Sequence, residues 1–152
     1  MLYVKNLSLL DSPLLTFYAS LLHYNNLLDQ AYEVANFALK KNPYSTKAIF
    51  VLCDLIQIKY QDMNKIEELS LSAFKYFPYD AFTLFVMKKI YEVKGDFAKF
   101  GDFSYIYGLR HHSIVDLENA KKVFQMLNQH EKAEKTEQRI NDLRRNLNLR
   151  NQ

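Results

Sequence analysis

The stretch AYEVANFALKKNP, residues 31–43, decides the fold of this chain. Its alanines, Ala31, Ala35 and Ala38, are spaced four and three apart, so on an α-helix they share one face. A face of small side chains allows a second helix to approach closely. Pro43 disfavours a helical conformation for the residue before it, so the helix should end there. The stretch predicts a helix that packs closely against a neighbour and then stops.

Composition favours helices for the rest of the chain as well. Hydrophobic residues make up 49% of the 152 residues and charged residues 24%, which is typical of a folded globular chain. With 3 Gly and 3 Pro, the chain has too few turn residues for the repeated hairpins of a sandwich or barrel. The composition therefore indicates an all-α protein.

Apolar residues recur at three- and four-residue spacing in about eight segments, which predicts amphipathic helices. Short polar turns such as Asn25-Asn26 and Gln61-Asp62 join these segments, and Phe77-Pro78 ends one of them in the same way as Asn42-Pro43. Short turns make consecutive helices antiparallel neighbours. An irregular helical bundle is the competing interpretation.

Small residues and prolines repeat at similar intervals along the chain. A first unit from Ser12 carries Leu15, Ala19, Leu22, Ala31, Ala38 and Pro43. A second unit from Thr46 carries Ile49, Cys53, Ile56, Ile66, Ser70, Ala73 and Pro78. A third unit from Ala81 carries Leu84, Met87 and Tyr91, then the turn Gly95-Asp96-Phe97. A fourth unit from Ile114 carries Leu117, Phe124, Ala133 and Ile140, with Asn128-Gln129 as its turn.

These positions resemble those of the tetratricopeptide repeat family, whose period is about 34 residues. The second helix of the third unit fits least well, because Phe100 replaces an alanine and Gly101 and Gly108 interrupt the pattern. The resemblance implies a right-handed α-solenoid of about four helical hairpins with a charged C-terminal capping helix. The expected division is an extension at 1–11 and a tail at 148–152. The repeat domain would be 12–147, in units of about 12–45, 46–80, 81–113 and 114–147.

Catalytic and metal-binding motifs do not occur in the sequence. Adjacent residues on a helix point about 100° apart, so His111-His112 is interpreted as part of an exposed turn rather than a metal site. Cys53 lies in an apolar helical segment and is interpreted as a small buried side chain. We therefore expect neither an enzyme nor a cofactor or metal.

The net charge of +3 is concentrated in the last helix and interleaved with glutamates, which is typical of a solvated face. Nucleic acid is therefore not expected as a partner, and an RNA-binding repeat is the least favoured alternative. No run reaches the roughly 20 apolar residues of a membrane span. The expected location is the cytoplasm, either at the edge of a membrane-associated complex or as a soluble domain of a longer anchored protein.

The resemblance implies that the first helix of each unit lines a concave groove. The predicted partner-binding residues are Phe17, Ser20, Tyr24, Phe50, Asp54, Gln57, Phe82, Phe85, Lys89, Glu92 and Lys122. One branch of the family grips a carboxylate with charged residues at set positions, which here hold Thr16, Ser20, Val51, Phe82 and Val86. That clamp is absent. Whether Phe50, Phe82 and Phe85 line the groove or fill the core stays open.

The resulting hypothesis is a scaffold or adaptor that binds an apolar or amphipathic protein segment in an aromatic groove. By analogy, such a protein would serve the assembly of a bacterial envelope, secretion or flagellar motility complex. The alternative is a structural subunit that packs or self-assembles through apolar end faces, so a homo-oligomer is a second expectation. Independently of this alternative, the segment Leu2-Tyr3-Val4, which precedes the first unit, is a candidate to occupy the groove of its own chain or to mediate dimerisation.

Overall fold

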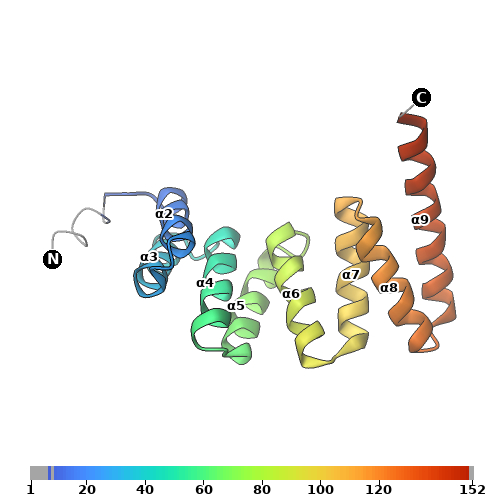
Figure 1. Cartoon of the computed structure of the whole chain (residues 1–152), viewed down its shortest axis with the longest axis horizontal. Helices are drawn as coiled ribbons and strands as arrows, with labels where there is room; N and C mark the ends of the chain where they lie inside the picture. Colours follow the sequence, from blue (N-terminus) through green and yellow to red (C-terminus); the bar gives the residue numbers. More distant parts are fainter. Residues whose placement is uncertain (1–6, 8, 151–152) are drawn as a thin grey trace. The chain divides into compact units, whose positions relative to one another are not determined.

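The structure is a computed structural model that describes residue 7 and residues 9–150. Within that part of the chain all regular secondary structure is α-helical (Figure 1). The helices are α2 (Ser12–Tyr24), α3 (Leu28–Lys41), α4 (Thr46–Lys59), α5 (Met63–Tyr76), α6 (Ala81–Lys94), α7 (Phe97–His111), α8 (Ile114–Met126) and α9 (His130–Arg150). The all-α prediction is confirmed. The predicted roles of Leu2-Tyr3-Val4 concern residues outside the described part.

Short polar side chains determine where several helices begin. A carboxylate or hydroxyl oxygen accepts a hydrogen bond from the backbone N–H three residues further on, which satisfies a donor that has no partner inside the helix. The capping residues are Asp11, Ser45, Asp62, Asp96 and Ser113. These residues lie at the turns between apolar segments, so the local sequence specifies where each of these helices begins.

Left-handed backbone conformations end many of the same helices. Asn26, Gln61, Gly95 and Asn128 have φ angles of 60°, 52°, 70° and 56°, and each lies between the two helices of a hairpin. A residue with this conformation reverses the chain and lets the next N–H groups bond to the last free carbonyls. The predicted turns are therefore confirmed. His112, with a φ of 52°, ends α7 in the same way without a proline.

Contacts divide the chain into two compact units, residues 1–83 and 84–152, called here the N-terminal and C-terminal units. In the N-terminal unit, α2 packs on α3, and each later helix through α5 packs on the one before it. Ala31, Ala35 and Ala38 are fully buried in this core. The close approach predicted from the alanine face is confirmed. The division into four repeat units stays a prediction, because the boundary between the compact units falls inside α6.

In the C-terminal unit, α7 packs on α8, and α8 packs on α9. Helix α7 is continuous from Phe97 to His111, so Gly101 and Gly108, which interrupt the repeat pattern, do not break the helix. Both glycines are buried against α8. A Cβ atom at Gly101 would lie 2.8 Å from Cγ1 of Val123, and one at Gly108 would lie 2.7 Å from Cγ of Leu117. The glycines are therefore present because α8 is too close for a larger side chain.

Helix α9 packs on α8 through Ala133, Thr136 and Ile140, which are buried. Its other sides carry charged residues, and ion pairs connect it to its neighbours. Arg144 pairs with Glu118 of α8 over 2.6 Å, and Lys132 pairs with Asp102 of α7 over 2.7 Å. Exposed pairs of this kind contribute little to stability, about 0–1 kcal/mol each. The charged surface suits the end of a repeat, although the capping role itself stays a prediction.

Candidate protein-binding groove

A hollow of about 410 Å³ lies on the N-terminal unit, beside the starts of the first, third and fifth described helices. It is lined by Pro13, Thr16, Phe17 and Ser20 of α2, by Ser45, Lys47, Phe50 and Val51 of α4 and its cap, and by Phe82 at the start of α6. We call this hollow the groove. The structure thus brings together four of the predicted site residues, Phe17, Ser20, Phe50 and Phe82.

Three phenylalanines give the groove its apolar character. The rings of Phe50 and Phe82 lie with centroids 5.2 Å apart and planes tilted by 47°. Both side chains are half-buried, whereas Phe17 is 63% exposed. Phe50 and Phe82 therefore pack against each other and also line the groove, so the choice between groove and core was not exclusive. An exposed phenylalanine beside such a pair is an apolar surface that a partner can cover.

The hydroxyl groups that line the groove already form hydrogen bonds within the protein. The Thr16 hydroxyl donates to the Ser12 carbonyl oxygen over 2.8 Å, and the Ser20 hydroxyl donates to the Thr16 carbonyl oxygen over 3.1 Å. The Ser45 hydroxyl accepts from the Ala48 N–H over 3.3 Å. These hydroxyls keep lone pairs that can still accept a hydrogen bond. Lys47 is the charged residue of the lining and is exposed.

Lys47, Pro13 and Ser45 were not among the predicted site residues. The sequence contained a signal for the first two, because Lys47 lies three residues before Phe50 and Pro13 lies four before Phe17. These spacings place each of them on the same helix face as the aromatic residue. Ser45 has no such signal, since it precedes its helix and is positioned by its capping hydrogen bond.

The other predicted residues of the N-terminal unit lie on the same two helices but outside the groove lining. Asp54 of α4 is near His23 of α2, with 3.4 Å between a carboxylate oxygen and Nδ1. Tyr24 ends α2 and is 89% exposed, and Gln57 is also exposed. Their side chains are accessible to a partner, and their role in binding stays a prediction.

The predicted residues of the C-terminal unit are described on their own. The Phe85 ring is half-buried and lies 6.4 Å from the Tyr107 ring of α7. Lys89 pairs with Glu92 one turn further along α6, over 2.6 Å, and both are exposed. Lys122 is exposed on α8. Phe85 thus contacts the second helix of its hairpin, and the other three lie on the surface.

A buried ion pair in the C-terminal unit was missed by sequence reasoning. The Lys88 ammonium group of α6 bonds to the Asp116 carboxylate of α8, and each side chain is 11% exposed. The ammonium nitrogen also lies 4.7 Å from the centre of the Tyr107 ring, a favourable cation–π contact. The Ser113 hydroxyl also donates to Asp116. The two charged residues are 28 positions apart, so no local pattern indicates the pair.

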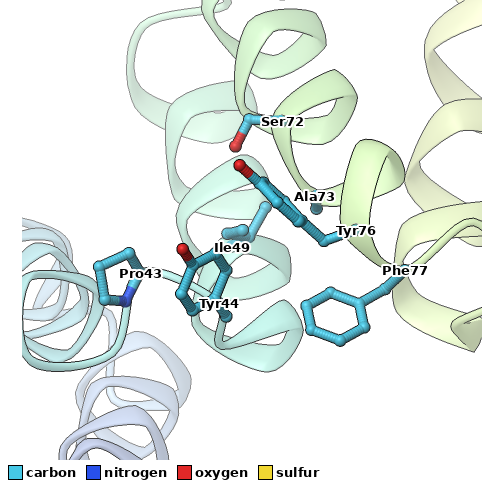
Figure 2. Close-up of a pocket in the computed structure, with 7 residues that line it drawn as sticks. All are labelled: Pro43, Tyr44, Ile49, Ser72, Ala73, Tyr76 and Phe77. Carbon is cyan, nitrogen blue, oxygen red and sulfur yellow. The ribbon is translucent and has the colours of Figure 1, made fainter.

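A second hollow, of about 240 Å³, lies on the N-terminal unit where α5 ends and where the loop before α4 passes (Figure 2). It is lined by Pro43, Tyr44, Ile49, Ser72, Ala73, Tyr76 and Phe77. Figure 2 shows the rings of Tyr44, Tyr76 and Phe77 around it, and the two tyrosine rings meet edge to face at 5.1 Å. Tyr44 directly follows Pro43, and Tyr76 and Phe77 directly precede Pro78. None of the residues that line this hollow was predicted as a site residue.

Side chains that could bind a metal ion do not cluster in the part of the chain that the structure describes. No group of three or more His, Cys, Asp and Glu side chains there could hold a metal ion. His111 is the last residue of α7 and His112 its cap, and both are exposed, as expected for a turn. Among the described helices none has the length and apolarity to cross a membrane.

Cys53 is 3% exposed, which confirms its interpretation as a buried side chain. Its sulfur lies 3.6 Å from the Ser70 hydroxyl oxygen and 3.9 Å from the Ile66 carbonyl oxygen. Burial raises the pKa of the Cys53 thiol to about 11, because the thiolate would lose its solvation. A thiol with this pKa is protonated near neutral pH and is a poor nucleophile.

This raised pKa predicts a pH dependence of stability. The folded state holds the thiol proton more tightly than the unfolded state, whose pKa is near 9.0. The stabilisation is therefore complete below that pH and is lost as pH rises toward about 11. We expect the free energy of unfolding to fall by about 2 kcal/mol more in the natural chain than in Cys53→Ala over this range. Urea unfolding at several pH values measures the difference, and parallel curves would contradict the prediction.

The helices and their hairpin turns define a class, the all-α helical repeat. Neither a protein-family model nor a curated protein matches the sequence. Two similar solved structures are a mutant of MamA and MamA MSR-1 C2. The first is 18% identical with a TM-score of 0.61, and the match covers 88% of this chain and 78% of the MamA mutant chain. The second is 17% identical with a TM-score of 0.61, and the match covers 90% of this chain and 79% of the MamA MSR-1 C2 chain.

This likeness shows the fold, an all-α helical-repeat solenoid, and the described hairpins fit a tetratricopeptide-like repeat. Membership of the tetratricopeptide family itself stays a prediction.

Proposed function

We propose that this chain is a protein-interaction scaffold whose groove binds an apolar or amphipathic protein segment. The observation that carries the proposal is the arrangement of Phe17, Phe50 and Phe82 around a hollow of about 410 Å³. Aromatic side chains in a concave surface are the usual anchors of protein recognition, because they offer a large apolar area with few degrees of freedom. The helical-repeat fold of the chain supports the same class of function.

The lining indicates which segment would fit. Lys47 can donate hydrogen bonds, whereas the Thr16 and Ser20 hydroxyls already donate to backbone carbonyls. A partner would therefore place apolar side chains on the phenylalanine rings and a carbonyl or carboxylate oxygen near Lys47. A row of cations that would grip a carboxylate terminus is not part of the lining, so an internal segment is the favoured ligand.

The remaining predicted residues extend this proposal. Tyr24, Asp54 and Gln57 would contact the flanks of a segment that runs along α2 and α4 beyond the groove. In the C-terminal unit, Lys89 and Glu92 form an exposed ion pair. Both side chains can form hydrogen bonds with polar residues that flank the apolar segment of a partner. Phe85 and Lys122 are proposed as further contacts of that unit. A role in assembling a large bacterial complex is the finer proposal, and it rests on analogy.

The test is binding to an arrayed library of 15-residue amphipathic peptides. We expect the natural chain to select peptides with apolar residues three or four apart. The double variant Phe50→Ala, Phe82→Ala should weaken that binding at least tenfold, since an anchor residue contributes about 1–2 kcal/mol or more.

The matched control is Ile58→Ala, Leu71→Ala, which removes two hydrophobic side chains of the same unit that are 49% and 46% exposed. Its binding should equal that of the natural chain. Circular dichroism should show full helicity for both double variants. Unchanged peptide selection by Phe50→Ala, Phe82→Ala would contradict the groove assignment.

A further inference from the structure

Helix α2 carries an apolar stripe on the side that faces solvent. Leu14, Phe17, Leu21 and Tyr24 are 54%, 63%, 44% and 89% exposed. Their spacing of three, four and three residues places them in one row along the 13-residue helix. We call this row the α2 stripe. Apolar residues with this spacing normally form the face by which a helix packs on its neighbour, but here they are exposed to solvent.

The opposite side of α2 is the one that packs into the N-terminal unit. Leu15 and Ala19 are fully buried, and Leu22 is 6% exposed. Helix α2 is therefore apolar on both sides. A helix at the surface of a globular protein normally has a polar outer face, and a helix that is apolar all round is normally covered. The α2 stripe is therefore an apolar surface that the packing of the described residues leaves exposed.

Charge distinguishes α2 from the other surface helices of its unit. Its sequence, SPLLTFYASLLHY, contains no Asp, Glu, Lys or Arg, and His23 is its one basic residue, in the last turn. Helix α3, by comparison, has an exposed Glu33 and an exposed Lys40. A stripe without charges cannot select a partner by opposite charge. It can, however, meet an identical stripe without like-charge repulsion.

We propose that the α2 stripe is the interface of a homodimer, in which α2 packs antiparallel against α2 of a second copy. A two-fold axis between Leu14 and Leu21 places Leu14 of each copy beside Leu21 of the other. The same pairing brings the N-cap Asp11 of one helix beside the Tyr24 end of the other. There the exposed tyrosine hydroxyl can donate to the carboxylate. Antiparallel helices also place each positive helix end beside a negative one.

The area available indicates a weak dimer. With Phe17 63% and Tyr24 89% exposed, and roughly 200 Å² for a fully exposed aromatic side chain, the stripe presents on the order of 500 Å² per copy. Two copies would bury on the order of 1,000 Å², just below the range of stable interfaces. We therefore expect a dimer that dissociates on dilution, with a dissociation constant on the order of 10 µM.

The dimer does not rest on the proposed peptide-binding function. Phe17 belongs both to the stripe and to the groove lining, so it is left unchanged in the test. Leu14 and Leu21 lie outside the groove lining and belong to the stripe alone. Phe50 and Phe82 belong to the groove alone. Variants at these two pairs therefore separate the failure of one proposal from the failure of the other.

The experiment measures molar mass by sedimentation equilibrium of the full chain between about 1 and 500 µM, a range that spans the expected dissociation constant. The natural chain should shift from 18.0 kDa toward twice that mass. The double variant Leu14→Glu, Leu21→Glu should stay at 18.0 kDa, because two carboxylates per copy would be buried at the interface. Phe50→Ala, Phe82→Ala should dimerise like the natural chain.

Leu71→Glu is the matched control, because Leu71 lies on α5 of the same unit and is 46% exposed, close to the 44% of Leu21. It should dimerise normally, and all variants should keep their helical circular dichroism. A natural chain that stays monomeric at the highest concentration would overturn the proposal. So would a dimer that persists in Leu14→Glu, Leu21→Glu. Dimerisation only after deletion of residues 1–6 would show that the chain's own start covers the stripe, which also overturns it.

Discussion

Replacing Asp116 by alanine is expected to lower the free energy of unfolding by about 3–5 kcal/mol. The change leaves the Lys88 ammonium group buried without its counter-charge, since both side chains are 11% exposed. It also removes the carboxylate to which the Ser113 hydroxyl donates. The cation–π contact with Tyr107 would remain, but it offsets only a small part of the loss.

A double-mutant cycle measured by urea unfolding isolates the pair. Lys88→Met should also destabilise the protein, because it leaves the carboxylate buried. The double variant Lys88→Met, Asp116→Ala should cost less than the sum of the two single changes, since it buries no charge. The control is Glu118→Ala, which breaks the more exposed pair with Arg144 and should cost less than about 1 kcal/mol. Equal costs for Asp116→Ala and Glu118→Ala would mean that the buried pair is not formed.

Gly108→Val is expected to destabilise the C-terminal unit by about 3 kcal/mol. Its Cβ atom would lie 2.7 Å from Cγ of Leu117 and 3.0 Å from the Leu117 backbone nitrogen. A backbone atom cannot move aside as a flexible side chain can, so α7 and α8 would have to separate. Because these helices form the core of the unit, the cost should appear as a lower midpoint of thermal unfolding.

Ala98→Val is the control for this change, because it adds a β-branched residue to an exposed position of the same helix. It should cost less than about 1 kcal/mol, which is the propensity difference alone. If both variants had the same midpoint, the close contact between α7 and α8 would be ruled out.

Local signals in the sequence were enough to predict the helices. The alanine face of Ala31, Ala35 and Ala38 predicted a buried contact, and all three are fully buried. Asn26 and Gly95 adopt the left-handed conformation that their residue types tolerate, at the turns where they were expected. In each case the structural feature depends on the types of residues that lie only a few positions apart in the sequence.

Part of the candidate site could also be predicted, because the resemblance to the tetratricopeptide repeat implies which helix positions line a groove. Phe17, Phe50 and Phe82 were predicted from those positions, and the structure brings them to one groove. Whether each ring was accessible could not be predicted. Exposure depends on how far neighbouring helices stand apart, and that distance is set by all the side chains between them. Lys47 was missed because the positions that the resemblance implies for the second unit begin at Phe50 and do not include it.

The sequence by itself determined the all-α class, the hairpin turns and the burial of Cys53, since each depends on residue type and local spacing. Only the tertiary structure decided that Gly108 is a packing contact rather than a break, and that Lys88 meets Asp116 inside the C-terminal unit. It also decided that α2 has an exposed apolar side. The physical reason is the same for all three. Steric contact, ion pairing and exposure depend on which distant residues come within a few ångströms, and only packing creates those distances.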